Sequence, residues 1–373
     1  MLGEKPTSKA LQPAWQGTRR PADSVEKHER LKVAVVGIGG AGNHTVTHLA
    51  KTGIKGACTI AVNTDLLDLS KSQADQKMLI GEKSTRGVGT NGKSLLGKTA
   101  AKESRERVGK LLASMDIVLI TAGLGGGTGV GAAPIIAEIA KGEGVATIGV
   151  VTKPHRHEKS RVKAASRAIT KLRRTCDTLI VIDSQKLLET TPRLPPDGVF
   201  RIADQVAANT IKVLVETITT PDPASPDVNH FKTLLQPGRT AVVGLGESDA
   251  LYRAEEAVRA ALNSPMLGTD RTKATGALVH VKADAHRPPE ETDRIEEIVA
   301  GTRSDSAHVV RGIHIDPDLQ GKMRITLVVT GITRPNAASR LGSLAPQLFN
   351  LEPRSESEKP LPLNLDLYQL EDF

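Results

Sequence analysis

The stretch GLGGGTGVG at residues 123–131 contains six glycines in nine positions, directly after the apolar run DIVLIT (116–121). Glycine loses more conformational entropy on folding than any other residue, so such a concentration needs a backbone reason. The close approach of a ligand or of another backbone is such a reason. An apolar run, a glycine turn and then a helical pattern together predict a buried strand whose carboxyl end carries this loop.

Four further apolar runs of the first half have the composition of buried strands: KVAVVG (32–37), CTIAVN (58–63), VATIGVVT (145–152) and TLIVID (178–183). Helical patterns separate the runs, at 43–53, 93–113, 130–141 and 160–174. This alternation predicts an α/β domain, with a parallel sheet that is covered on both faces. Ligands of such sheets bind at the carboxyl ends of the strands, where the glycine clusters lie.

The second half has a different organisation. A helical pattern over about 197–218 is ended by the proline-rich segment TTPDPASPD (219–227). Four strand-like runs (240–246, 276–284, 307–315, 324–332) and two helical patterns (249–262, 290–300) then predict a smaller α+β domain with a mixed sheet. We therefore expect a disordered basic N-terminal extension (1–30), a ligand-binding α/β domain (31–196), a central helix (197–220), a second domain (221–334) and a flexible tail (335–373).

The composition excludes several classes of protein. The hydrophobic content of 39% and charged content of 25% are typical of soluble globular domains. No apolar run is long enough to cross a bilayer, and the N-terminal residues lack the apolar core of a signal peptide. The two cysteines, Cys58 and Cys176, imply no disulfide framework. We expect a cytoplasmic protein that does not insert into membranes.

The formal net charge of +8 favours anionic partners. However, one Trp, two Tyr and four Phe leave no stacking platform for single strands, and no nucleic acid is expected as a partner. Basic residues concentrate in 153–174, where Glu158 is the only acid. This segment is either a solvated helix face or a patch for an acidic partner.

The motif VVGIGGAGN places Gly37, Gly39 and Gly42 in a GxGxxG array between a strand and a helix. Such a turn directs backbone N–H groups at a phosphate, and by itself it fits an NAD(P)-dependent oxidoreductase. That function requires an acid at the end of the second strand, where this chain has Asn63, with Asp65 two residues later. The second glycine cluster favours a different site, in which two loops hold one polyphosphate through backbone amides and hydroxyls. The structural alternative is that both clusters are only tight turns.

Together these motifs resemble the tubulin/FtsZ superfamily of filament-forming GTPases, and FtsZ in particular. The resemblance covers about residues 32–332 and rests on VVGIGGAGN, IAVNTD, GEKSTRGVGTNG, ITAGLGGGTGVGAAPIIAEIAK, IGVVTKPHRHE, CDTLIVID and IDPDL, in the family's order. It implies a Rossmann-like GTP-binding domain, a long central helix and a C-terminal activation domain. It also implies head-to-tail filaments for cell division that hydrolyse GTP, with Mg²⁺, at the subunit interface.

The resemblance assigns the nucleotide contacts. The first phosphate loop is formed by Gly39, Gly40, Ala41, Gly42 and Asn43, with Asn63 and Asp65 after the second strand. The α- and β-phosphates are wrapped by Gly125, Gly126, Gly127, Thr128 and Gly129, and the γ-phosphate is sensed by Thr90, Asn91 and Gly92. The ribose is assigned to Glu158, with Arg161 nearby, and the base to Ser184, Phe200 and Asp204. Asp204 would select guanine by accepting from its N1–H and amino group. The alternative for Phe200 is a plain core residue.

Hydrolysis in this family uses a loop of the neighbouring subunit with the pattern N-x-D-x-x-D. Here the loop reads SPDVNH (225–230), so Asp227 keeps the first acid, His230 replaces the second and Ser225 replaces the asparagine. Asp227 and His230 are the predicted catalytic residues. His230 either accepts a proton in place of the acid or is a surface residue of a loop that has lost its task. A GTP-binding filament or switch with little or no hydrolysis is therefore the alternative function.

Two weaker features complete the predictions. Residues 361–373, LPLNLDLYQLEDF, resemble in position the peptide by which FtsZ recruits membrane tethers and regulators to the division site. The alternative is a frayed terminus. His44 and His48 have the i, i+4 spacing of a metal pair, but no third ligand is evident and we expect a solvated face rather than a metal site.

Overall fold

The computed structural model describes residues 31–190, 196–219, 239–267, 274, 276–284, 289–300 and 308–331. The predicted N-terminal extension (1–30), the predicted catalytic residues Asp227 and His230 and the predicted tail (335–373) lie outside these residues.

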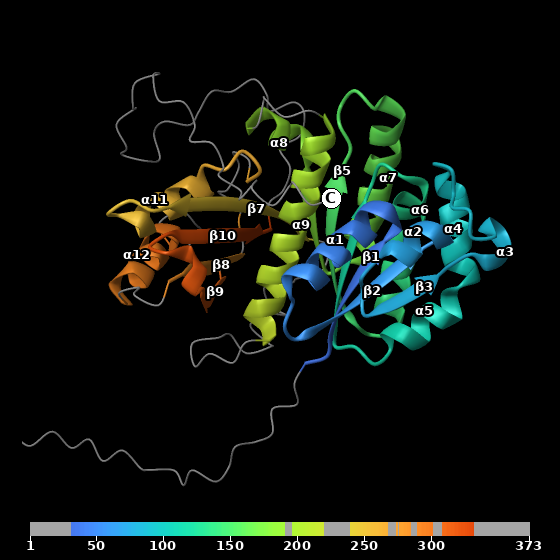
Figure 1. Ribbon diagram of the computed structural model, residues 1–373, viewed down its shortest axis with the longest axis horizontal. Helices are drawn as coiled ribbons and strands as arrows, with labels where there is room; N and C mark the ends of the chain where they lie inside the picture. Colours follow the sequence, from blue (N-terminus) through green and yellow to red (C-terminus); the bar gives the residue numbers. More distant parts are fainter. Residues whose placement is uncertain are drawn as a thin grey trace, which may run out of the picture. The chain divides into compact units, whose positions relative to one another are not determined.

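In the described residues, ten strands form one sheet in the order β3-β2-β1-β4-β5-β6-β7-β10-β8-β9 (Figure 1). The first six strands in the chain pair in parallel. They are β1 (Val33–Ile38), β2 (Ala57–Asn63), β3 (Gln76–Leu79), β4 (Ile117–Gly123), β5 (Ala146–Lys153) and β6 (Thr178–Asp183). The five strands predicted for this half are confirmed, and β3 was missed because its sequence, QKML, is short and only half apolar.

Helices cover both faces of the parallel strands. Along β1, Val33 and Val35 face one core cluster while Ala34 and Val36 face the other. The first cluster is closed by α1 (Gly39–Thr52) and α9 (Pro196–Thr219). The second is closed by α4 (Ser94–Glu103), α5 (Arg105–Leu112), α6 (Gly127–Gly142) and α7 (Lys159–Thr175). Because each strand is buried on both sides, its sequence is continuously apolar rather than alternating, as the sequence analysis assumed.

The predicted helix over 93–113 is wrong as a single element. It is divided at Ser104 into α4 and α5, because Ser104 leaves helical geometry (φ −96°, ψ 12°) and its hydroxyl accepts a hydrogen bond from the Gly81 amide. Three short helices were also missed: α2 (Leu66–Lys71), α3 (Glu82–Thr85) and α8 (Ser184–Thr190). Helices of four to seven residues are too short to show a helical period.

The second half continues the same sheet. Its elements are β7 (Arg239–Ser248), α11 (Arg253–Leu262), β8 (Gly276–Ala283), α12 (Pro289–Ala300), β9 (His308–Ile315), the 3₁₀ turn η1 (Pro317–Leu319) and β10 (Met323–Thr330). β10 is antiparallel to β7 and β8, while β8 and β9 are parallel, so the predicted mixed sheet is confirmed. It is not a separate sheet, because β7 pairs in parallel with β6 over three residues.

The long helix α9 packs between the two groups of strands, as Figure 1 shows. Its apolar residues Ile202, Val206 and Ile211 belong to the same core cluster as Leu278 on β8 and Val310 on β9. The predicted central helix is thus confirmed, and its burial on several sides explains its many apolar positions. Among the helices that the structure describes, none is long and apolar enough to span a bilayer.

Helices α4 and α6 approach each other at glycines. A Cβ atom on Gly97 would lie 2.5 Å from the carbonyl oxygen of Gly127, and one on Gly131 would overlap the carbonyl oxygen of Ser94. The neighbours are backbone atoms, which cannot move aside without displacing a helix. This contact fixes α4 against the start of α6, where the second glycine loop lies.

We predict that Gly131→Ala destabilises the protein by at least about 2 kcal/mol, because the added methyl group forces α4 away from α6. The matched control is Gly142→Ala in the same helix, where a Cβ meets nothing within 4 Å. There the change should be neutral or stabilising by up to about 1 kcal/mol. Urea denaturation of both variants measures the difference, and equal stabilities would contradict the close helix contact.

Candidate functional site

A cavity of about 430 Å³ opens at the carboxyl ends of β1, β4 and β5. This volume falls within the range of roughly 300–1,000 Å³ that is usual for small-molecule sites. The cavity is lined by Ile38, Gly39, Gly40, Ala41, His44, Gly123, Gly125, Gly126, Gly127, Thr128, Gly129, Thr152, Lys153, Pro154, Glu158, Arg161, Ser184, Phe200, Ala203 and Asp204. The structure therefore brings both glycine clusters, the Glu158 segment and the central helix around one space.

The two glycine loops touch each other because β1 and β4 are neighbours in the sheet. Gly39 has a φ of 71°, and a Cβ there would lie 3.2 Å from the Gly129 nitrogen and from the Thr128 Cβ. In contrast, a Cβ on Gly126 meets nothing within 4 Å, so this residue faces open space. The glycines therefore have two roles. Gly39 allows two backbone segments to pack closely, and Gly126 leaves the backbone open to a ligand.

Helices α1 and α6 both begin at this cavity without a side-chain cap. Their N-cap residues are Ile38 and Gly126, which have no polar side-chain atom that could accept a hydrogen bond from the backbone N–H groups of the first turn. The first N–H groups of a helix have no partner within the helix and carry a partial positive charge. Two uncapped helix N-termini converging on one cavity form an anion site.

A third loop packs on the second glycine loop. The Thr128 hydroxyl lies 2.7 Å from the Thr64 hydroxyl and 3.3 Å from the Thr90 hydroxyl, and all three are buried. A Cβ on Gly127 would lie 2.7 Å from the Lys93 nitrogen. Thr90 therefore reaches the cavity through Thr128, while the predicted Asn91 and Gly92 are exposed and do not line it.

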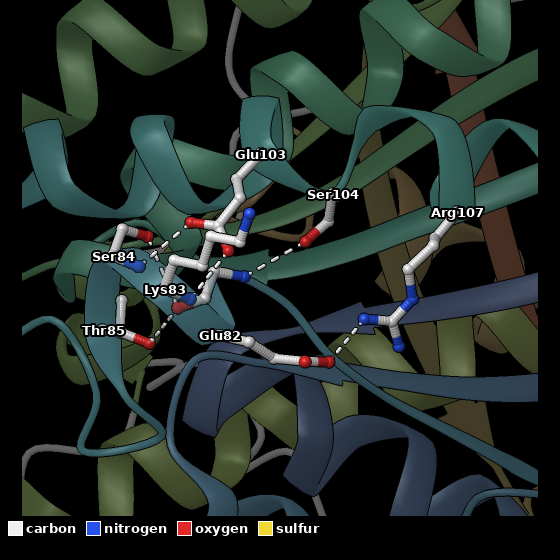
Figure 2. Close-up of polar contacts among 8 residues, drawn as sticks. Glu82, Lys83, Ser84, Thr85, Glu103, Ser104 and Arg107 are labelled. Carbon is white, nitrogen blue, oxygen red and sulfur yellow. Dashed lines mark hydrogen bonds and ion pairs between the residues drawn. The ribbon is translucent and has the colours of Figure 1, made fainter.

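The segment that leads to Thr90 is anchored by side chains of α4 and α5 (Figure 2). The Glu103 carboxylate accepts hydrogen bonds from the amides of Lys83 (2.8 Å) and Ser84 (3.0 Å). The bond from Lys83 holds the pKa of Glu103 below its usual value. The Ser104 hydroxyl accepts from the Gly81 amide at 3.1 Å.

Three further contacts, made by Thr85 and Arg107, hold the same segment in place. The Thr85 hydroxyl bonds to the Gly81 carbonyl at 2.8 Å and to that of Thr64 at 3.2 Å. Arg107 pairs with Glu82 at 2.5 Å (Figure 2). The break at Ser104, which the sequence analysis missed, is therefore part of what positions the Thr90 loop.

The opposite end of the cavity is formed by Glu158, Phe200 and their neighbours. Glu158 pairs with Arg161, while its other oxygen, Oε1, is buried and makes no hydrogen bond within the described structure. Phe200 is 39% exposed, which rules out the alternative that it is a core residue. Its ring meets the buried His155 ring edge-on, at 5.4 Å between centroids and 79° between planes. Part of the Phe200 side chain is thus accessible to a ligand in the cavity.

Asp204 lies one turn further along α9 and is half-buried in the cavity. Desolvation raises the pKa of Asp204 to about 7. Removal from water disfavours the charged form of a carboxyl group, and a ligand with two N–H donors would favour it again.

Several predicted site residues do not line the cavity. Gly42 is a packing position, since a Cβ there would lie 2.6 Å from the Thr121 carbonyl oxygen. Asn63 donates to the Asp68 carboxylate at 2.7 Å and accepts from the Thr64 amide, and Asp65 caps α2 by accepting from the Asp68 amide. These two residues therefore shape the end of β2. No acidic side chain at that end lines the cavity, as a dinucleotide site would need.

Asn43 differs from these residues, because both polar atoms of its side chain are buried and neither makes a hydrogen bond in the described structure. An unpaired buried amide costs free energy, so a ligand that bonds to it would be stabilised. Asn43 is the fifth residue of α1, between Ala41 and His44, which both line the cavity.

Other lining residues were missed or placed elsewhere. His44 was expected on a solvated face, and it is exposed at the cavity edge. Thr152 and Lys153 were not singled out, although they end β5, and Lys153 pairs with Asp183 at 3.2 Å. Their position at the carboxyl end of a parallel strand was the signal that could have identified them. Thr64 does not line the cavity but contacts it through Thr128, and its position directly after β2 offered the same signal.

Comparison with known proteins supports the resemblance. Residues 32–192 match the model of the Tubulin/FtsZ family GTPase domain, and residues 239–333 match that of the FtsZ family C-terminal domain. Cell division protein FtsZ 1 of Methanocaldococcus jannaschii is 44% identical over 81% of this chain and 84% of its own length. Cell division protein FtsZ of Methanothermobacter thermautotrophicus is 37% identical over 99% of this chain and 95% of its own length.

Solved structures agree with these relatives. An FtsZ dimer from M. jannaschii superposes with a TM-score of 0.79, at 43% identity over 82% of this chain and 89% of the other. CetZ2 from Haloferax volcanii, with a TM-score of 0.67 and 22% identity, covers 80% of this chain and 92% of its own and shares the fold. The NAD(P)-dependent oxidoreductase that the GxGxxG array left open is not supported by any of these matches.

Asp204 gives the site a testable pH dependence. Because the pKa is about 7 in the folded protein and near 3.8 when exposed, ionisation of Asp204 destabilises the fold as the pH rises from about 4 to 7. We compare the free energy of unfolding of nucleotide-free Asp204→Asn with that of nucleotide-free wild type. We predict that this difference shifts in favour of the variant by about 1–3 kcal/mol when the pH is raised from 5 to 8. One pKa unit corresponds to about 1.4 kcal/mol, and solvent still reaches part of this carboxyl.

Denaturation of wild type and Asp204→Asn at both pH values measures the effect. Asp249→Asn, in an exposed turn, is the control for removing one carboxylate. If the stability difference between Asp204→Asn and wild type is the same at pH 5 and pH 8, Asp204 does not have the raised pKa.

Proposed function

Since this chain belongs to the FtsZ family of cell-division GTPases, we propose that it binds GTP in the cavity between α1, α6 and α9 and assembles head to tail into filaments. The single observation that carries this proposal is the meeting of two uncapped helix N-termini and two glycine loops at the ends of adjacent parallel strands. A head-to-tail contact is heterologous and does not close, so it generates filaments.

The triphosphate is proposed to lie across the two glycine loops. Backbone N–H groups of Gly39 to Ala41 and of Gly125 to Gly129 would donate to phosphate oxygens, and the Thr128 hydroxyl would add a side-chain donor. No lysine is needed in these loops, because the helix N-termini supply the positive potential.

Thr90, Asn91 and Gly92 are proposed to respond to the γ-phosphate. Thr90 supports this assignment through its hydroxyl contact with Thr128. A γ-phosphate that bonds to Thr128 competes with this contact, so the loop would differ between the GTP and GDP states. The Glu103 and Ser104 anchor keeps the base of the loop fixed while its tip responds.

The nucleoside is proposed to lie between Phe200, Asp204 and Glu158. The accessible part of Phe200 suits stacking of the base, and Asp204 would accept from N1–H and the amino group of guanine. The unpaired oxygen of Glu158 suits a ribose hydroxyl, with Arg161 orienting the carboxylate and Ser184 beside the base.

Magnesium is proposed to accompany the phosphates. Mg²⁺ is usually held by phosphate oxygens, waters and one or two carboxylates. Asp68 does not line the cavity but lies next to it, since its Oδ2, which accepts a hydrogen bond from Asn63, is 3.5 Å from where a Cβ on Gly40 would be. Asp68 would therefore hold the ion through a water, with Asp65 adjacent through the α2 cap. The ion would neutralise charge on the phosphates.

Hydrolysis is proposed to occur between subunits, where the loop at 225–230 of one subunit meets the nucleotide of the next. Asp227 would accept a hydrogen bond from the attacking water, and His230 would take the place of the second acid. Neutral imidazole accepts a proton near pH 7, so the substitution is chemically competent.

A second candidate function is a GTP-binding filament or switch with little or no hydrolysis. The observation that favours it is the sequence SPDVNH, which has lost two of the three side chains of N-x-D-x-x-D. The nucleotide would then stabilise the subunit and the filament without being consumed.

We further propose that the protein acts in the cytoplasm at the division site and that residues 361–373 bind a membrane tether or a regulator. The apolar and acidic alternation of LNLDLYQLEDF supports this proposal, since such a peptide can dock through its apolar side chains. Deletion of these residues should abolish recruitment and leave nucleotide binding intact.

Guanine selection predicts a change in nucleotide preference. Asp204→Asn should weaken GTP binding by about 10–100-fold and leave ATP binding nearly unchanged, because loss of a charged hydrogen-bond partner costs about 1.5–3 kcal/mol. Isothermal titration with both nucleotides measures this preference, and Asp249→Asn is the control. Equal losses for GTP and ATP would contradict a role of Asp204 in reading the base.

Catalysis between subunits predicts cooperative turnover. Phosphate release per subunit should rise with protein concentration, Asp227→Asn should lower it at least about tenfold, and His230→Asp should raise it by restoring the second acid. GTP binding with no phosphate release from wild type, together with pelleted filaments, would support the second candidate. Turnover independent of concentration would contradict a shared site.

A further inference from the structure

Helix α7 carries a row of basic side chains along its exposed side. Four of them recur every fourth residue and a fifth follows three residues later, and all five are exposed: Lys159, Lys163, Arg167, Lys171 and Arg174. Residues at this spacing lie on one face of a helix. With a rise of about 1.5 Å per residue, the row is about 22 Å long.

The charges of this row are not neutralised. None of the five side chains forms an ion pair with any residue that the structure describes, and no residue of α7 is acidic. Some exposed arginines elsewhere have acidic partners, as Arg105 has Glu138 and Arg294 has Glu255, while Arg259 forms no ion pair with a described residue. What distinguishes α7 is the number of such cations on one helix. Like charges four residues apart destabilise a helix, so local helix stability does not explain the arrangement.

The row is held rigidly. The opposite face of α7 is buried against α6, β5 and β6 through Ala165, Ala168, Ile169 and Leu172. Figure 1 shows α7 beside α6. Only the outer face of the helix is accessible. The basic side chains can therefore contact a broad surface, but the helix cannot insert into a narrow groove.

The residues between the cations indicate the chemistry of a partner. Ser166 and Thr170 are exposed, and α7 exposes no large apolar side chain. A protein partner would need apolar or aromatic anchors, and sequence-specific nucleic-acid recognition needs side chains that reach into a groove. A bilayer rich in anionic headgroups requires only a high density of exposed positive charge.

We propose that the basic row of α7 binds the anionic headgroups of a phospholipid bilayer, as a peripheral contact without insertion. Each basic residue near an anionic surface contributes about 1 kcal/mol, so the five residues of one subunit would bind the bilayer weakly, with a dissociation constant on the order of 0.1–1 mM. A filament would repeat the row once in each subunit, so its binding would be strengthened by multivalency.

The test is flotation of the full chain with lipid vesicles, in the absence of nucleotide, so that the result does not depend on GTP binding or assembly. Vesicles of phosphatidylcholine alone are compared with vesicles that contain phosphatidylcholine and phosphatidylglycerol in equal amounts. We expect binding only to the anionic vesicles, decreasing as salt is raised.

The decisive variant is Lys163→Gln with Arg167→Gln and Lys171→Gln, which should weaken binding by about 10–100-fold. The matched control is Lys102→Gln with Lys110→Gln and Arg259→Gln, three exposed residues outside α7 that give the same change in net charge. The control should bind within about twofold of wild type. Circular dichroism and thermal melting show whether each variant is folded.

Three outcomes would overturn the proposal. The first is equal flotation with neutral and anionic vesicles. The second is an equal loss in the two triple variants, which would show that net charge alone is responsible. The third is tighter binding of duplex DNA or polyglutamate than of the anionic vesicles, at equal concentration of negative charge and physiological salt. If that binding is weakened in the α7 variant and not in the control, the row is assigned to a nucleic acid or an acidic protein. If the α7 triple variant does not fold, the single variants Lys163→Gln, Arg167→Gln and Lys171→Gln replace it, and an undiminished binding of all three to the anionic vesicles would overturn the proposal.

Discussion

The site depends on the close approach of backbone segments that only glycine permits. The loop after β1 touches the loop after β4 where Gly39 meets Thr128 and Gly129, and the segment near Lys93 packs on Gly127. Any side chain at these contacts would separate the loops. Their convergence leaves the amides at the starts of α1 and α6 facing one cavity, and the phosphate site that we propose follows from this arrangement.

Helix α9 links this cavity to the second half of the protein. Near its start, Phe200 and Asp204 line the cavity, while further along the helix Thr217 packs against Gly312 on β9. Its apolar residues belong to the core that contains β8 and β9. Because a packed helix moves as a unit, a ligand that contacts Phe200 acts on an element that both groups of strands share.

The cavity also retains polar groups that the protein does not satisfy. The Asn43 amide and Glu158 Oε1 are buried without hydrogen bonds in the described structure, and burial raises the pKa of Asp204 to about 7. Each of these costs free energy in the folded protein. These three groups surround one cavity, where a ligand can supply the missing partners, whereas the Thr178 and Ser264 hydroxyls are buried without hydrogen bonds elsewhere in the described structure.

The α/β class, most strands, the long helix and the two glycine loops could be predicted from the sequence, because apolar periodicity and glycine spacing are local properties. The order of the motifs also identified the family. The tertiary structure alone decided that β7 extends the first sheet, that Ser104 divides a helix and that Glu103 anchors the Thr90 segment. It also decided that Thr64, Thr90 and Thr128 meet and that Phe200 is exposed. These features are contacts between residues distant in the chain, which depend on how the layers pack and leave no periodic signal in any one segment.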